Sequence, residues 1–331
     1  MATRPRRQAR FGDGADPLIA IVDWYFATVF GRHEGPGIVP FYCDPARVGR
    51  FALNPERLAQ GDEASIFQLF VGLAMFQARR DVLIMQQQRS CTRKETEFLI
   101  SATHLGRQAA HSTCPSLQNP ATFVSSCSVR KINGSITCDH ADQPCSIREA
   151  SKWFRRLGDH GKLPMSAYFE FGRQGDLPQL LAEAEVTTTN PSRRAEILVV
   201  KFARAHRVGR KLATLFVSAL STPALAPGLT PWHPLIDGNE LVVIDTHAAR
   251  AIDRLRQGRG AKTYSARSAW LRRRAKAIDL HSYRRDLPSY SPRLIQQALY
   301  AFGSKSNRLA WNLPCVGNCL AGMCPFHESE E

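Results

Sequence analysis

Residues 206–213 read His206-Arg207-Val208-Gly209-Arg210-Lys211-Leu212-Ala213, and this stretch decides the fold predicted for the chain. Upstream of it, Asn190 followed by Pro191 is a typical helix start, and apolar residues then recur at helical spacing. Downstream, helical spacing continues to about Leu220. The sequence therefore predicts two helices joined by a tight turn, with Lys211 just inside the second helix.

A second stretch, Leu241-Val242-Val243-Ile244-Asp245-Thr246-His247, is an apolar run that stops at an aspartate. Asp245 stands where an N-cap is needed, because a short acidic side chain satisfies the free amides of a first helical turn. We expect a helix to begin directly after it.

The rest of the chain also favours helices, and we predict a mostly α protein. Asp62 is a candidate N-cap for a helix with almost no polar face, which is typical of a buried central helix. No segment alternates clearly enough to predict a sheet. Other helix boundaries are predicted by a capping-box pattern at Ser146 and Glu149, by Ser291 with Pro292, and by Gly303 as a stop.

Composition divides the 331 residues into five parts. Residues 104–146 are rich in Ser, Thr, Cys and Asn and contain Cys114, Cys127, Cys138 and Cys145, so we predict a Cys-rich insert there. The parts are a disordered basic arm (1–16), N-terminal helices of the core (17–103), the insert (104–146), the main core (147–310) and a Cys-containing tail (311–331).

The net charge of +15 indicates a polyanionic partner. Nucleic acid is the commonest such partner, and a membrane surface is the rival. No apolar run is long enough to span a bilayer, and the first residues lack the apolar core of a secretory signal. We therefore expect a protein that is not secreted and is cytoplasmic, nucleoid-associated or nuclear.

Four stretches, taken in order, resemble one family. They are Phe67–Asp81, Val208–Ala213, Val243–Arg250 with its Asp-Thr-His sequence, and Gln296–Gly303. Over roughly residues 60 to 325 the chain resembles the helix-hairpin-helix (HhH-GPD) DNA glycosylases of the endonuclease III superfamily. The resemblance implies a two-lobed helical glycosylase fold, a monomer, and double-stranded DNA with an extruded base as the partner.

The resemblance also implies catalytic roles for Lys211 and Asp245. Lys211 would attack the anomeric carbon of the sugar and form a Schiff base, which marks an enzyme with β-elimination lyase activity. Asp245 would stabilise positive charge that develops on the sugar, or activate Lys211 or a water molecule. The alternative is a surface lysine and a plain helix cap. No cofactor is needed for this chemistry.

The turn is predicted to bind a DNA phosphate through the amides of Val208, Gly209 and Arg210, which have no helical partner. Gly209 would take positive φ and let the backbone come close. Gln77 resembles the residue that fills the gap left by an extruded base; a polar helix end is the alternative. Two departures stand out, because Arg207 replaces a glycine usual in the family and the interval from Lys211 to Asp245 is long.

Three cysteines in the tail, Cys315, Cys319 and Cys324, are candidate ligands of a metal centre. Relatives often carry a 4Fe-4S cluster at this place, but the spacing here differs, and zinc also suits the ligands. The fourth ligand is left open among His327, Cys43 and a cysteine of the insert.

Two functions thus follow from the sequence. The first is a base-excision DNA glycosylase with AP lyase activity. The alternative is a helix-hairpin-helix protein that binds DNA without catalysis, with a monofunctional glycosylase between the two. The damaged base is not indicated by any motif.

Overall fold

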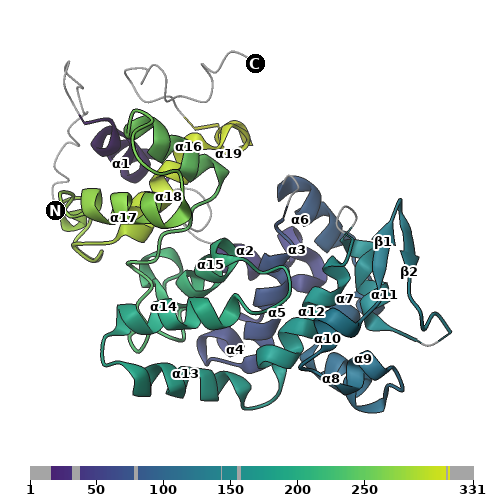
Figure 1. The fold of residues 1–331 in the computed structure, drawn as a ribbon. Helices are drawn as coiled ribbons and strands as arrows, with labels where there is room; N and C mark the ends of the chain where they lie inside the picture. Colours follow the sequence, from purple (N-terminus) through teal and green to yellow (C-terminus); the bar gives the residue numbers. More distant parts are fainter. Residues whose placement is uncertain are drawn as a thin grey trace. The chain divides into compact units, whose positions relative to one another are not determined.

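The computed structural model describes residues 16–31, 38–77, 81–142, 144–154, 158–310 and 312–313. These residues are mostly helical, as predicted, and their strands form one two-stranded sheet (Figure 1). The chain divides into a middle unit, residues 37–238, and a terminal unit, residues 1–36 with 239–331. Most of the predicted basic arm and nearly all of the predicted tail lie outside the described residues.

The middle unit carries the hairpin and the Cys-rich insert. Its elements are α2 (Ile38–Tyr42), α3 (Pro45–Val48), η1 (Gly49–Phe51), α4 (Pro55–Ala59), α5 (Glu63–Ala74), α6 (Asp81–Ser90), α7 (Arg93–Ile100), α8 (Ala102–His111), α9 (Pro115–Gln118), α10 (Phe123–Ser126), β1 (Arg130–Ile132), β2 (Ser135–Thr137), α11 (Ser146–Trp153), η2 (His160–Lys162), α12 (Leu163–Ala167), the π-helical turn η3 (Tyr168–Gly172), α13 (Asp176–Thr187), α14 (Pro191–Phe202), α15 (Arg210–Ser221) and η4 (Pro223–Leu225).

Helix α5 is the central helix of this unit. Asp62 caps it, as predicted, by accepting a hydrogen bond from the Ser65 amide at 2.8 Å. Nearly every residue from Ser65 to Ala74 is buried, which agrees with the lack of a polar face in the sequence. A Cβ on Gly72 would lie 2.8 Å from the Tyr42 ring, so this glycine lets α2 approach α5 closely.

Helices α14 and α15 form the predicted hairpin and share an aromatic core with α5. Asn190 N-caps α14 through the Arg193 amide. Phe202, at the end of α14, packs edge-on against Phe216 of α15 with 4.9 Å between ring centroids. It also stacks on Trp232 at 5.8 Å. This packing fixes the orientation of the two helices. It therefore fixes the positions of the two helix ends that the turn connects.

The insert contains the only strands in the described part of the chain, which corrects the expectation that no sheet is present. Strands β1 and β2 pair antiparallel, with Arg130 opposite Thr137. The turn between them uses Asn133 and Gly134, both at positive φ. This dipeptide supplies the backbone twist that a two-residue hairpin needs. The predicted capping box is also wrong, because Cys145 is the N-cap of α11 and its side chain makes no capping hydrogen bond.

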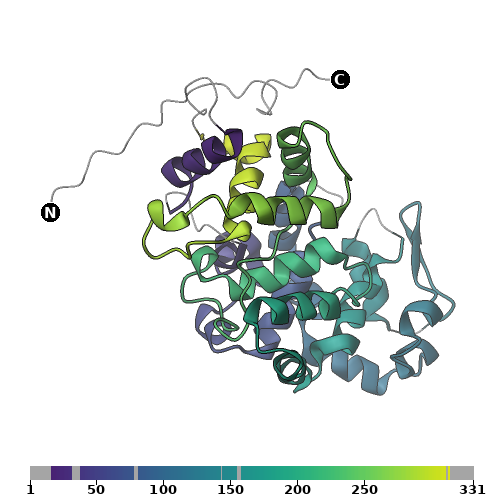
Figure 2. The same ribbon diagram turned by 60° about the vertical axis from the view of Figure 1, so that its left-hand side comes forward.

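The terminal unit joins segments far apart in the sequence. Its elements are α1 (Pro17–Thr28), α16 (Thr246–Leu255), α17 (Tyr264–Ala275), η5 (Leu280–Ser282), α18 (Pro292–Gly303) and α19 (Lys305–Ala310). Asp16 caps α1, and Ser291 caps α18 as predicted. Trp24 of α1 packs edge-on against Phe302 of α18, so the two helices lie side by side (Figures 1 and 2).

Candidate functional site

The turn between α14 and α15 has its left-handed residue at Arg207, where φ is +62°. The sequence predicted positive φ at Gly209, and this prediction is wrong. Gly209 is the N-cap of α15 and has φ −86° and ψ 173°, an extended conformation open to any residue. The reversal of the chain is therefore made two residues earlier than expected, by a residue with a side chain.

The amides of the turn differ in their availability. The Val208 amide donates to the Ala205 carbonyl at 2.9 Å, which contradicts the expectation that it lacks a partner. At Gly209 no side chain caps the first turn of α15. A Cβ on Gly209 would meet no atom within 4 Å, so the space before the start of α15 is open. The N-terminus of α15, rather than Val208, is the part of the hairpin with room for an anion.

Lys211 lies in the first turn of α15 and is partly buried. Within the described ranges, no hydrogen bond or ion pair engages its ammonium group. Its neighbour Arg210 is paired with Glu196 of α14 at 2.7 Å. Lys211 therefore lies at the open start of α15, between buried Leu212 and the paired Arg210.

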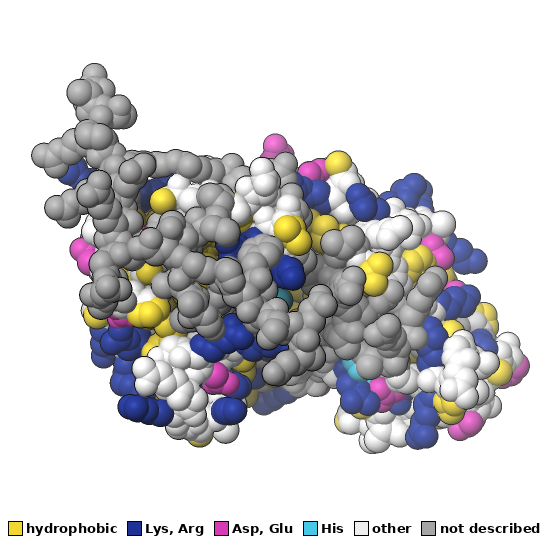
Figure 3. Space-filling model, turned by 90° about the horizontal axis from the view of Figure 1, so that it is seen from above, with side chains coloured by type: hydrophobic (Ala, Val, Ile, Leu, Met, Phe, Trp, Pro, Cys, Tyr) yellow, Lys and Arg dark blue, Asp and Glu magenta, His cyan; other side chains and the backbone are white. Residues whose placement is uncertain are grey.

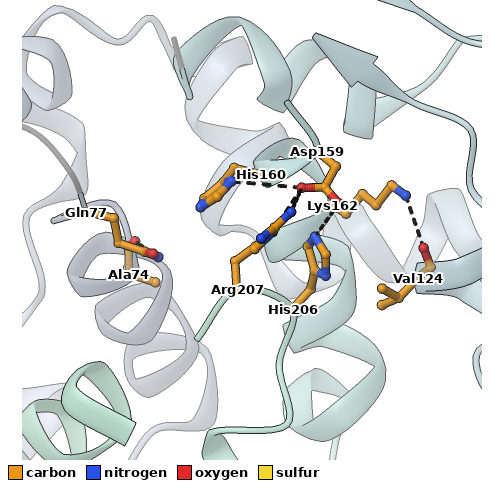
Figure 4. A network of polar contacts seen from close by, with 8 residues as sticks. All are labelled: Ala74, Gln77, Val124, Asp159, His160, Lys162, His206 and Arg207. Atoms are coloured by element: carbon orange, nitrogen blue, oxygen red, sulfur yellow. Dashed lines mark hydrogen bonds and ion pairs between the residues drawn. The ribbon is translucent and has the colours of Figure 1, made fainter. Parts of the chain in front are cut away.

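Asp159 binds the side chains of both residues that precede Val208 (Figure 4). Arg207 donates from Nε at 3.0 Å and places Nη2 at 2.9 Å from the same oxygen, Oδ1. The other oxygen, Oδ2, lies 3.2 Å from Nε2 of His206. Nε2 makes no hydrogen bond of regular geometry, so this is a close polar contact. The His206 amide is fixed separately by Ser166 Oγ at 2.9 Å.

Burial and the neighbouring charges set the protonation states of Asp159, His160 and His206 at neutral pH. Burial is the largest single influence and would raise the pKa of Asp159, but the hydrogen bonds and charges of Arg207 and His206 together outweigh it, and the pKa lies below its usual value. Burial lowers the pKa of His160 to about 4 and also lowers the pKa of His206. At pH 7 both imidazoles are neutral, and the carboxylate is paired with the Arg207 guanidinium.

His160 and Lys162 fix the segment that carries Asp159. His160 is 6% exposed, and its Nδ1 lies 4.0 Å from Asp159 Oδ1. Lys162 is 5% exposed and donates to the Val124 carbonyl at 3.0 Å (Figure 4). Between them, Gly161 packs so closely on α11 that a Cβ would lie 2.6 Å from the Ile147 carbonyl oxygen. The carboxylate is thus presented by a rigidly packed turn.

Gln77 lies three residues after the end of α5 and is the last residue described before the gap at residues 78–80. Its side-chain amide donates to the Ala74 carbonyl at 2.7 Å, so it satisfies the C-terminus of its own helix (Figure 4). This is the geometry of a polar helix end, the alternative that the sequence left open. A role for Gln77 in DNA binding stays a prediction.

Asp245 belongs to the terminal unit, whereas Lys211 belongs to the middle unit. It N-caps α16, as predicted, by accepting from the Ala248 amide at 2.6 Å. The apolar run before it is buried and forms neither helix nor strand. The carboxylate is therefore held in place by its own helix.

A buried arginine that the sequence did not single out lies near Asp245. Arg293 of α18 is 3% exposed and donates to Gln296 and Gln297 at 2.7 and 2.9 Å. Burial lowers the pKa of Arg293 to about 10, and the negative charge of Asp245 is among the influences that oppose this shift. The sequence offers no local signal for its burial, because arginine is mostly exposed and only tertiary packing makes this one an exception.

The metal prediction falls mostly outside the described residues, which include none of Cys315, Cys319, Cys324 and His327. Cys43 is described, and burial raises its pKa. The four cysteines of the insert are free thiols. In the described ranges, no three His, Cys, Asp or Glu side chains are arranged to hold a metal ion.

The surface carries the excess of basic residues that the composition predicts. Lys and Arg side chains stand out over much of the described face in Figure 3, where acidic side chains are more isolated. The described helices include none that is both long and apolar enough to cross a bilayer. The basic side chains agree with the net charge of the sequence and add nothing to the identity of a partner.

No protein-family model matches this chain, and neither a curated protein nor a solved structure matches it.

Proposed function

We propose that the protein is a base-excision DNA glycosylase with AP lyase activity, in which Lys211 is the nucleophile and Asp245 stabilises charge on the sugar. The observation that carries the proposal is the start of α15: an open helix N-terminus at Gly209, followed two residues later by a partly buried lysine without a partner in the described ranges. A phosphate at the helix start would bring a sugar near this amine.

The proposed reaction consists of attack with release of the base, ring opening and β-elimination. The neutral Lys211 amine attacks the anomeric carbon, and the bond between that carbon and the base breaks with its electron pair leaving on the base. The base takes up a proton from solvent or a neighbouring acid. One proton of the amine moves to the ring oxygen as the sugar ring opens, which leaves a protonated Schiff base. A general base then removes a proton from the 2′ carbon, the electron pair forms the double bond between the 2′ and 3′ carbons, and the bond from the 3′ carbon to the phosphate oxygen breaks, with the phosphate leaving as an anion.

Asp245 supplies a negative charge where the sugar becomes cationic. Its rigid capping hydrogen bond to Ala248 favours this role, because a fixed carboxylate needs no reorganisation as charge develops. Loss of one such electrostatic stabiliser costs on the order of 10²–10³ in rate. The two residues lie in different units, so each role needs its own variant.

Borohydride trapping tests the proposal. The protein is incubated with duplex oligonucleotides that carry an abasic site or one of several damaged bases, with and without borohydride. We expect a covalent adduct with the wild type and none with Lys211→Gln. Lys201→Gln is the matched control, since Lys201 lies in the same hairpin but is paired with Glu183, and it should trap normally.

Asp245→Asn should abolish base release while DNA binding survives. Normal base release by this variant would overturn the role of Asp245. Base release by the wild type without trapping would identify a monofunctional glycosylase. Binding without turnover on every lesion would leave the non-catalytic DNA-binding protein, the second candidate, which the replacement of a hairpin glycine by Arg207 favours.

A further inference from the structure

Arg207 adopts a backbone conformation that costs free energy for any residue except glycine. Its φ of +62° lies in the left-handed region, where a side chain is crowded by the carbonyl group. Such a residue persists only where its surroundings hold it. Half of the Arg207 side chain is exposed, so hydrophobic packing is not what holds it.

The surroundings that hold Arg207 converge on one carboxylate. Asp159 receives the Arg207 guanidinium on Oδ1 and the His206 imidazole on Oδ2, so both of its oxygens face the turn (Figure 4). Asp159 itself follows the described residue Gly158, whose carbonyl accepts from the Lys131 amide, and precedes the tightly packed η2. One carboxylate from outside the hairpin thus contacts the side chains of two successive residues of the turn.

A different role for Arg207 would be a direct phosphate contact. The guanidinium is already engaged by Asp159 through two nitrogens, and the pair is close to neutral overall. A phosphate that recruited Arg207 would have to displace the carboxylate. The geometry therefore favours a structural use of Arg207 over a ligand contact.

We propose that Asp159 is a positioning residue, which holds Arg207 in the left-handed conformation and thereby sets the backbone path into Gly209 and the N-terminus of α15. The inference rests on the proposed function only in naming DNA as the ligand of that helix end. Arg207 together with Asp159 would then do what a glycine alone can do in a turn of this shape.

The test compares Asp159→Asn, Arg207→Gly and the double variant. Amide hydrogen exchange at Val208, Leu212 and Ala213, whose amides donate to the Ala205 and Gly209 carbonyls, reports hairpin order in the free protein without DNA. The affinity for an abasic-site duplex reports binding. We expect Asp159→Asn to speed exchange and weaken binding by roughly tenfold, since the left-handed conformation costs on the order of 1–2 kcal/mol once it is no longer held.

The double variant distinguishes a positioning role of Asp159 from a purely stabilising one. Glycine adopts positive φ without help, so Asp159→Asn with Arg207→Gly should return exchange and binding to within about threefold of the wild type. A purely stabilising role for Asp159 predicts no such rescue. Arg207→Gly alone should also keep the hairpin ordered, and it remains informative if Asp159→Asn fails to fold.

Asp176→Asn is the matched control, because Asp176 pairs with Arg173 at the same side-chain exposures, 23% and 52%, as Asp159 with Arg207. It should leave the hairpin unchanged. Unchanged exchange in Asp159→Asn, or a double variant as disordered as the single one, would overturn the inference. If neither the wild type nor any variant binds DNA, the proposed function is wrong. Hydrogen exchange then still decides whether Asp159 positions Arg207.

Discussion

Gly209→Ala separates a phosphate-binding hairpin from an ordinary turn. The φ of −86° suits any residue, and the added Cβ meets no atom within 4 Å. The change therefore strains nothing in the free protein. Its cost is the poorer capping of α15 by alanine, about 0.5–1 kcal/mol of the free energy of unfolding.

The effect on DNA binding should be larger than the effect on stability. The Cβ would occupy the open space through which a phosphate oxygen approaches the first amides of α15. Loss of one hydrogen bond to a charged group amounts to about 1.5–3 kcal/mol, which corresponds to roughly a 10- to 100-fold increase in Kd.

Fluorescence anisotropy with a labelled abasic-site duplex at fixed salt measures the affinity, and urea denaturation measures the stability. Asn190→Ala is the control, because it removes the side-chain cap of α14 and costs a similar free energy at the far end of the hairpin. It should bind DNA normally. A Gly209→Ala protein that is folded and binds within twofold of the wild type would refute phosphate binding at this helix end.

Two further predictions concern the turn that carries Asp159. The folded pKa of His160 is about 4, against an ordinary value of 6.5, so between these values the unfolded chain binds more protons and stability falls as pH decreases, by at most about 3 kcal/mol. His160→Gln should remove this part of the pH dependence in urea denaturation from pH 7 to pH 4; an identical slope in both proteins would contradict it. Gly161→Ala should lower the free energy of unfolding by about 1–3 kcal/mol, since its Cβ would lie 2.0 Å from Ser151 Oγ and 2.6 Å from the Ile147 carbonyl oxygen. A midpoint of thermal unfolding equal to that of the wild type would exclude the close packing.

The parts of the fold that could be predicted are those encoded locally. Asp62, Asn190, Asp245 and Ser291 all cap the helices that the sequence assigns to them, because a cap acts on amides two or three residues away. The small β-hairpin was missed although Asn133-Gly134 is a strong turn signal, since its three-residue strands are too short to alternate visibly.

The parts of the candidate site that could not be predicted depend on residues distant in the sequence. The sequence shows Arg207 where the family usually has a glycine, but nothing local identifies Asp159 as the residue that contacts it. The left-handed residue was assigned to Gly209 because glycine tolerates that conformation, yet the structure has it at Arg207, whose side chain contacts the distant Asp159. Which atoms surround Asp245 likewise depends on Arg293, which lies in another helix.

The pairing of α1 with α18 has a consequence for biosynthesis. Trp24 and Tyr25 of α1 leave the ribosome about 270 residues before α18, which covers this helix in the finished protein. At typical translation rates that interval lasts on the order of 10–60 s. The middle unit is completed during this time and can fold first, while the aromatic face of α1 stays available to chaperones.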